Sequence, residues 1–186
     1  MELVKNITNN KLIKIFLISL LGSILLTISA KIKIPFYPVP MTMQTFIVLF
    51  MGIAFGWKIS VLTISTYLLE GIAGLPVFAG TPEKGVGLIY FTGPTMGYLI
   101  GFLVATFCAG YVNFRTNYFL IFIKLILCVS TIYILGIFWL GLLIGWDKPI
   151  LQLGVIPFML AELFKILLLL LFTPTLLKIK KLIKII

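Results

Sequence analysis

Histidine is absent from this chain of 186 residues, and cysteine and acidic residues are scarce. The two cysteines, Cys108 and Cys128, fall in apolar segments without the spacing of metal ligands, so we expect no zinc or iron site and no cofactor. Without histidine there is no Ser–His nucleophile, and the nucleotide-binding pattern G-x-x-x-x-G-K-[ST] does not occur. Only five residues are acidic, which leaves little for general acid–base catalysis. These absences predict that the protein is not an enzyme.

Apolar residues make up 61% of the sequence and charged residues 11%, and the mean hydropathy is +1.22. Soluble domains are far less apolar, so the composition predicts an integral membrane protein. A membrane-spanning helix needs roughly 20 apolar residues. We therefore expect an all-α fold in a single membrane domain, residues 1–186, forming a six-transmembrane-helix bundle. The expected spans are approximately 11–30, 41–55, 57–73, 92–113, 118–146 and 155–177.

The basic residues are divided unequally between the two sides of the predicted bundle. With six spans, both termini share a side with the second and fourth loops. An excess of lysine and arginine marks the cytoplasmic side, so both termini are predicted to be cytoplasmic, in a multi-pass protein of the cytoplasmic (inner) membrane. The terminal side holds Lys5, Lys11, Lys14, Lys58, Arg115, Lys178, Lys180, Lys181 and Lys184, and the other side holds Lys31, Lys33, Lys84 and Lys148.

A cleaved signal peptide is the alternative interpretation of the N-terminus. Basic residues precede an apolar run, residues 15–29, and the small residue Ala30 follows it. The run is long for such a peptide, and its removal would leave five spans with a less favourable distribution of charge.

Two opposite charges, Glu162 and Lys165, lie inside the last apolar run. Each charge costs about 2.5–3.5 kcal/mol at the centre of a bilayer, so the pair should face protein or water and not lipid. The i, i+3 spacing places both side chains on one face of a helix. A charged pair within the membrane indicates a functional site, and a purely structural ion pair is the alternative.

Proline and glycine gather in the loops expected on the outer side. Residues 34–40 contain Pro35, Pro38 and Pro40, which cannot continue a helix and predict a rigid, extended loop. The loop at residues 71–91 is longer and largely apolar, which predicts a lid. Polar and aromatic side chains from five spans should converge beneath these loops and form a pocket. They are Gln44, Glu70, Tyr98, Trp139, Trp146, Glu162 and Lys165.

Several of these residues have a simpler interpretation. Tyr98 and Trp146 are of the type found in the interfacial aromatic belt, and Glu70 falls where a carboxylate can be solvated. In the first span, Ser19, Ser23 and Thr27 recur every four residues. Such a small-xxx-small stripe allows close helix packing, either within this bundle or against another membrane subunit.

Three ordered segments, PVPMTMQT at 38–45, GLPVFAG at 74–80 and GPTMGYLIGF at 93–102, resemble the BioY family. Together with the residues around them they extend the resemblance over about residues 23–165. The resemblance implies a six-helix substrate-binding (S) subunit of an energy-coupling-factor transporter, specific for biotin. Such a subunit binds biotin near its outer face and delivers it with a transmembrane coupling subunit and two ATPase subunits. This accounts for the missing nucleotide-binding pattern.

The sequence departs from the family pattern at several positions. The family's Asp-x-x-Lys pair matches Glu162 and Lys165, but the acid is longer and the preceding Pro-Gly is absent. We therefore expect a more regular helix, with the reach of the pair shifted by about 1 Å. Met96 replaces a glycine and Glu70 an apolar residue, which changes the expected shape of the pocket. The family's docking stripe for the coupling subunit matches Ser23 and Thr27.

The chemistry of biotin fits these residues. Its ureido ring has N–H donors for Glu162 and a carbonyl acceptor for Lys165. Phe78 and Tyr98 are candidates for aromatic walls, and the biotin carboxylate would take Lys84, backbone amides of the glycine-rich loop, or Lys165. The predicted substrate-binding residues are Gln44, Phe78, Gly80, Lys84, Tyr98, Glu162 and Lys165, and the predicted partner-docking residues are Ser23 and Thr27.

Two other functions remain open at this point. An S subunit for another small vitamin would use the same scaffold. A solitary secondary transporter would work without ATPases, although such proteins show inverted repeats and no convincing internal repeat is present here.

Overall fold

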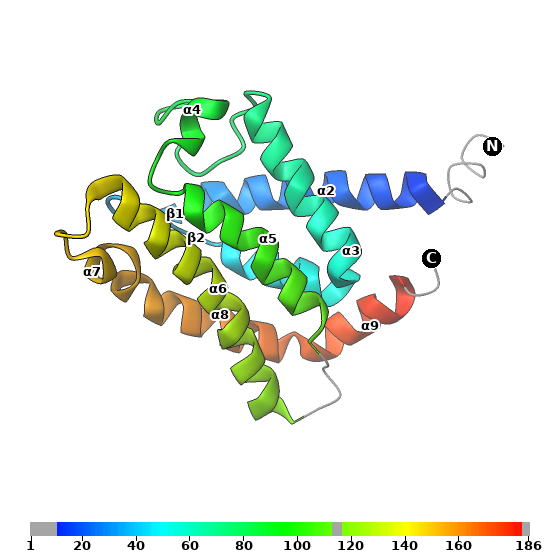
Figure 1. Cartoon of the computed structure of the whole chain (residues 1–186). Coiled ribbons are helices and arrows are strands. Elements are labelled where there is room, and N and C mark those ends of the chain that lie inside the picture. The colour runs from blue at the N-terminus through cyan, green and yellow to red at the C-terminus, as the bar shows by residue number, and fades with distance from the viewer. Residues whose placement is uncertain (1–10, 113–116, 184–186) are drawn as a thin grey trace.

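The computed structural model describes residues 11–112 and 117–183, and this part of the chain is a bundle of apolar helices (Figure 1). The start of α2 (Lys11–Lys31) and the end of α9 (Thr173–Ile183) lie at one end of the bundle (Figure 1). At the other end lies a short antiparallel strand pair, β1 (Lys33–Ile34) and β2 (Met41–Thr42), in which Lys33 pairs with Thr42. This strand pair is the only sheet within the described residues.

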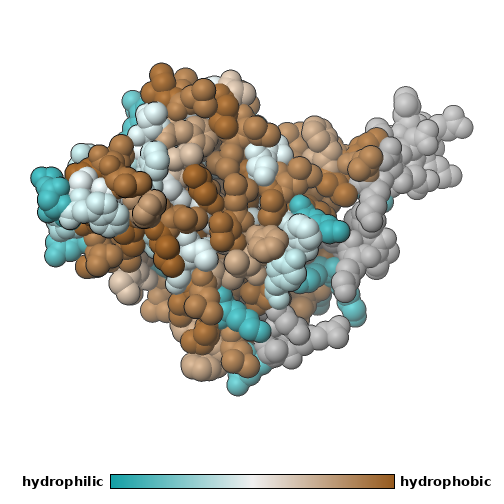
Figure 2. Space-filling view, viewed as in Figure 1, coloured by the Kyte–Doolittle hydropathy of each residue, from teal (hydrophilic) through white to brown (hydrophobic). Residues whose placement is uncertain are grey.

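Long apolar helices dominate the described residues. Four helical stretches are long and apolar enough to cross a membrane, and α5 (Met96–Gly110) is a shorter apolar helix. Large apolar side chains are exposed along α2, α6 (Tyr118–Ile144) and α8 (Met159–Leu171), and the view in Figure 2 is brown over most of its area. A surface of this kind suits lipid, so the chain is a multi-pass membrane protein. The four stretches are Leu12–Lys31, Gln44–Ile72, Tyr118–Ile144 and Ile150–Leu171.

Helix α3 (Gln44–Ile72) consists of two arms that meet at Gly56. Gly56 has φ 76° and ψ 165°, a conformation that strains any residue with a Cβ. The chain changes direction there, so that the arms at residues 44–55 and 57–72 follow different paths (Figure 1). This break lies at the expected boundary between the second and third spans.

The expected span 92–113 is represented by α5, which is only 15 residues long and follows the single turn α4 (Leu88–Phe91). The last residue of that expected span, Asn113, lies outside the described residues. Helix α5 lies against α6 at very short range because its glycines allow it: a Cβ added to Gly101 would lie 2.6 Å from the Cα of Ile132. This close approach brings the aromatic side chains of both helices together.

The last expected span, 155–177, is not the regular helix that the sequence suggested. It is preceded by α7 (Ile150–Gly154), and the chain then breaks at Val155 and continues through the 3-10 turn η1 (Ile156–Phe158) before α8 begins. Pro157 lies in this turn, where its missing amide hydrogen is tolerated. A second interruption at Phe172 separates α8 from α9, and Pro174 in the first turn of α9 removes an amide donor there.

The charge count behind the predicted orientation rests in part on Lys5, Arg115 and Lys184, which lie outside the described residues. Among the described lysines, Lys14 is near the start of α2 and Lys178 and Lys181 are in α9, at one end of the bundle.

Candidate functional site

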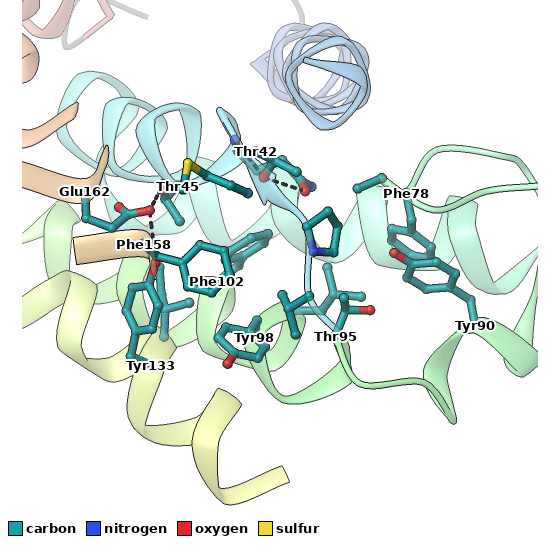
Figure 3. Close-up of a pocket in the computed structure, with 17 residues that line it drawn as sticks. Thr42, Thr45, Phe78, Tyr90, Thr95, Tyr98, Phe102, Tyr133, Phe158 and Glu162 are labelled. Carbon is teal, nitrogen blue, oxygen red and sulfur yellow. Dashed lines mark hydrogen bonds between the residues drawn. The ribbon is translucent and has the colours of Figure 1, made fainter. Parts of the chain in front are cut away.

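A cavity lies near the end of the bundle that carries the strand pair, between α3, α5, α6, α8 and the loops (Figure 3). Its volume is about 50 Å³. In Figure 3 the polar group around Glu162 lies at one end of the cavity, and Phe78 and Tyr90 lie at the other. Aromatic side chains line much of it, namely Phe78, Tyr90, Tyr98, Phe102, Tyr133 and Phe158, and the polar lining consists of Thr42, Gln44, Thr45, Thr95 and Glu162.

Glu162 and Lys165 form a buried ion pair at the polar end. They lie one turn apart in α8, and the distance from Lys165 Nζ to Glu162 Oε1 is 2.7 Å. The residues are only 6% and 4% exposed. Lys165 Nζ also donates to the Thr42 carbonyl oxygen at 2.6 Å and to Thr45 Oγ1 at 2.8 Å. All three ammonium donors are thereby used, so the lysine is held firmly behind the carboxylate.

The two carboxylate oxygens of Glu162 have different surroundings. Oε1 accepts hydrogen bonds from Lys165, from Thr45 Oγ1 at 2.9 Å and from the Tyr133 hydroxyl at 3.1 Å (Figure 3). Oε2 is buried and has no hydrogen-bond partner among the described residues. A buried acceptor without a partner is costly, so Glu162 keeps unused capacity for a donor beside the cavity.

Aromatic rings in mutual contact line the cavity at both of its ends. Phe78 stacks on Tyr90 with ring centroids 4.7 Å apart and meets Tyr67 edge-on at 5.2 Å. Tyr98 meets Tyr133 edge-on at 5.9 Å, and its hydroxyl donates to the Gly154 carbonyl oxygen at 2.9 Å. The walls of the cavity are therefore apolar faces whose polar tips are already engaged elsewhere.

Tyr90 belongs to α4, outside the membrane-spanning stretches. Burial raises the pKa of its hydroxyl above the ordinary value for tyrosine. The hydroxyl therefore stays neutral, and it accepts a hydrogen bond from the Gly80 amide at 3.3 Å.

The structure places the predicted binding residues as follows. Gln44, Phe78, Tyr98 and Glu162 line the cavity. Lys165 is not a lining residue but forms an ion pair with Glu162, which is. Gly80 and Lys84 are not among the lining residues, and Lys84 Nζ donates to the Pro38 carbonyl oxygen at 3.4 Å. The roles of all seven residues in binding stay predictions. Gly80 and Lys84 would need a rearrangement of the loop to contact a molecule in the cavity.

The other polar residues singled out in the sequence have separate surroundings. Trp139 Nε1 donates to the Gly93 carbonyl oxygen at 2.8 Å, while Trp146 is 58% exposed. Glu70 does not line the cavity: its Oε1 accepts a hydrogen bond from Ser23 Oγ at 2.8 Å. Glu70 therefore joins α3 to α2 and is not part of the cavity lining.

The predicted docking stripe on α2 is partly turned inward. Ser23 is fully buried, and Thr27 Oγ1 donates to the Ser23 carbonyl oxygen at 2.9 Å. Ser19 is also buried, and its hydroxyl has no partner among the described residues. Ser23 thus serves packing between α2 and α3 in this conformation, and the docking role of Ser23 and Thr27 stays a prediction.

Several lining residues were missed in the sequence, above all Thr45, Tyr90 and Tyr133. Thr45 lies in the PVPMTMQT segment, from which only Gln44 was predicted to bind the ligand. Tyr133 is a polar aromatic residue in the middle of a long apolar helix, which is a weaker signal of the same kind. Tyr90 had no signal of its own.

The sequence is similar to a known protein family and to several of its members. The model of the BioY family matches residues 4–182. The chain is 36% identical over 141 residues to a protein of Pyrococcus horikoshii named probable biotin transporter BioY, covering 76% of this chain and 82% of that one. It is 35% identical over 143 residues to the biotin transporter BioY of Thermotoga maritima, covering 76% and 83% of the two chains.

A solved structure has a similar fold. It is described as the S-component for biotin from an ECF-type ABC transporter, and its similarity to this chain has a TM-score of 0.75 at 25% identity. The match covers 91% of this chain and 94% of that chain.

Proposed function

The chain belongs to the BioY family, and we propose that it is the biotin-binding S-component of an energy-coupling-factor transporter. It captures biotin with high affinity at the outer face of the membrane, for import driven by partner ATPases. The protein is a transport subunit and performs no chemical conversion of its ligand.

The structural observation that supports this proposal is the buried pair of Glu162 and Lys165. An ion pair that is only structural would use both carboxylate oxygens within the protein, whereas Oε2 of Glu162 has no partner among the described residues. The ureido ring of biotin offers N–H donors of the kind that this oxygen can accept. We place the ureido ring at the Glu162 end of the cavity, against Tyr133 and Thr45.

The rest of the ligand follows from the shape of the site. The sulfur-containing ring and the valerate chain are apolar, and they would extend along Tyr98 towards Phe78 and Tyr90. The carboxylate would then lie nearest the loops of the strand-pair end, where Lys84 is the donor that we propose and Gly80, whose amide donates to Tyr90, shapes the loop beside it. Gln44 lines the same path.

The finer architecture is part of the same proposal. Counting the two arms of α3 separately, α2, α5, α6 and α8 complete six transmembrane helices in one membrane domain. An even number of crossings fits the position of the start of α2 and the end of α9 at one end of the bundle. We propose that this end is cytoplasmic, in the cytoplasmic membrane, and that a transmembrane coupling subunit and two ATPase subunits dock there and at Ser23 and Thr27.

Isothermal titration of the purified full chain in detergent with biotin tests the proposal. We expect tight, stoichiometric binding by the wild-type protein and a loss of at least about 100-fold in affinity for Glu162→Gln, because a charged hydrogen bond to the ligand is removed. The matched control is Glu83→Gln, which changes a carboxylate whose side chain is 77% exposed in the outer loop and should bind like the wild type. Folded wild-type protein that binds thiamine or riboflavin but not biotin would overturn the assignment of the ligand.

A further inference from the structure

Residues 77–81, which we call the wall segment, are buried although they belong to no helix or strand. Phe78 is 1% exposed and Ala79 is 4% exposed, and both line the cavity. Buried backbone groups need hydrogen-bond partners. Within the segment itself, Thr81 N and Thr81 Oγ1 donate to the Phe78 carbonyl oxygen at 3.3 Å and 2.8 Å, which leaves the other carbonyl oxygens to partners outside it. The residues that supply the remaining partners therefore determine the conformation of the wall segment.

Side chains from four other elements bind the backbone of the wall segment. Tyr67 of α3 donates to one carbonyl oxygen, Lys31 of α2 to two, and Lys33 of β1 to one, while Tyr90 of α4 accepts from one amide. The distances are 3.1 Å to Val77 O, 2.9 Å to Phe78 O, 3.0 Å to Thr81 O, 2.9 Å to Ala79 O and 3.3 Å from Gly80 N. Every residue of the segment is thus fixed from outside.

Lys31 is the most connected of these anchors. It is the last residue of α2, and its Nζ atom also lies 3.3 Å from Thr81 Oγ1. Hydrogen bonds from a charged donor are roughly twice as strong as neutral ones. A single ammonium group therefore joins the end of α2 to both ends of the turn that carries Phe78 and Ala79.

Tyr67 binds the wall segment from α3. It is fully buried, and its hydroxyl accepts a hydrogen bond from Gln44 Nε2 at 2.8 Å while it donates to Val77. Its ring supports Phe78 edge-on. One turn further along α3, Gly71 leaves space for the same ring, because a Cβ at that position would collide with Phe78. The face of α3 formed by Tyr67 and Gly71 is therefore the seat of Phe78.

Neither Lys31 nor Tyr67 lines the cavity. We propose that they are positioning residues for the ligand, because they hold residues 77–81 in the conformation in which Phe78 and Ala79 form the cavity wall. The inference rests on the proposed function in that the ligand is taken to be biotin. Because the wall is ordered by these anchors before the ligand arrives, its ordering does not have to be supplied by binding energy. Loss of an anchor should let the wall open and release the ligand.

The ligand-dependent test uses dissociation kinetics of biotin from the full chain in detergent. We expect Lys31→Met and Tyr67→Phe each to raise the dissociation rate by about 10-fold without lowering the association rate, since interface changes act mainly on dissociation. Lys31→Arg, which keeps charged donors, should return the rate to within about 3-fold of the wild type. The matched controls are Lys14→Met, at the opposite end of α2, and Tyr118→Phe, a tyrosine at the start of α6 that is 58% exposed. Both controls should release biotin like the wild type.

A second measurement does not depend on the ligand. Ala79→Cys, in a chain that also carries Cys108→Ala and Cys128→Ala, reports the opening of the wall through its rate of reaction with a water-soluble maleimide. The rate should rise about 10-fold when Lys31→Met or Tyr67→Phe is added, because the segment then opens more often. Unchanged labelling overturns the inference, whether or not biotin binds. Raised labelling with unchanged biotin release overturns the positioning role, and absence of biotin binding by the wild type overturns only the proposed function.

Discussion

Tyr133 donates a hydrogen bond to Glu162, with 3.1 Å between the phenolic oxygen and Oε1, although the two residues are 29 positions apart. The tyrosine belongs to α6 and the carboxylate to α8, so this bond forms only when the two helices pack. Glu162 Oε1 is thereby held both from α6, by Tyr133, and from within α8, by Lys165.

Removal of that bond should weaken ligand binding. We expect Tyr133→Phe to reduce biotin affinity by about 10-fold, which is the effect of losing a hydrogen bond worth about 1.5 kcal/mol to a charged group. Titration calorimetry measures the change. Tyr37→Phe is the control, because Tyr37 is 86% exposed and lies outside the cavity. An equal loss in both variants would contradict the role of Tyr133.

Breaking the buried ion pair should cost stability. Lys165→Met leaves the Glu162 carboxylate buried without a cation, and we expect the free energy of unfolding to fall by about 3–5 kcal/mol. The double variant Glu162→Gln with Lys165→Met should recover most of this loss in stability, while its biotin affinity stays at least about 100-fold below that of the wild type. Unfolding in mixed micelles measures the stability.

The control for that experiment is Lys148→Met. It removes an ion pair with Asp147 whose side chains are 57% and 73% exposed, and should change stability by at most about 1 kcal/mol. If Lys165→Met were no more harmful than this control, the two buried charges would not depend on each other.

Gly71→Ala tests the seat of Phe78. The added methyl group collides with the Phe78 ring, so we expect a loss of about 1–3 kcal/mol in stability together with weaker biotin binding. The smaller side chain in Phe78→Leu should relieve the collision, so the double variant should be more stable than the sum of the two single losses predicts. Strict additivity would show that the methyl group and the ring do not meet.

The proposed orientation can be tested by labelling single cysteines in intact cells. In a chain carrying Cys108→Ala and Cys128→Ala, Glu83→Cys in the outer loop should react with an impermeant maleimide. Lys58→Cys, which follows the break in α3, should react only after the cells are opened. The opposite pattern would invert the bundle and place the site on the cytoplasmic side.

Much of the helical plan follows directly from the sequence. Gly56 and Trp57 lie at the expected boundary between two spans, and the break in α3 falls there. The pair of Glu162 and Lys165 could also be predicted to face protein and not lipid, because two charges in an apolar run have few interpretations. Both features depend on local sequence alone, which is why a single chain is enough to predict them.

The rest of the site depends on packing between distant segments. Thr45 and Tyr133 meet Glu162 only through the contacts of α3, α6 and α8, and neither residue type is unusual in a membrane helix. Pro157 was visible, but the absence of Pro-Gly suggested a regular helix, whereas the structure has a 3-10 turn there. Lys84 was expected in the pocket because it is basic and near it, but its side chain binds Pro38 of the neighbouring loop.

The small volume of the cavity, about 50 Å³, has a consequence for the timing of capture. Sites for small molecules usually measure about 300–1,000 Å³, so we expect the proposed ligand to enter only while the wall segment is displaced. The wall segment would then return around the ligand, held by the same Lys31 and Tyr67 hydrogen bonds that hold it in this structure. We therefore expect capture to be gated by a motion of the empty protein, so that at high ligand concentration its rate levels off at the rate of that motion.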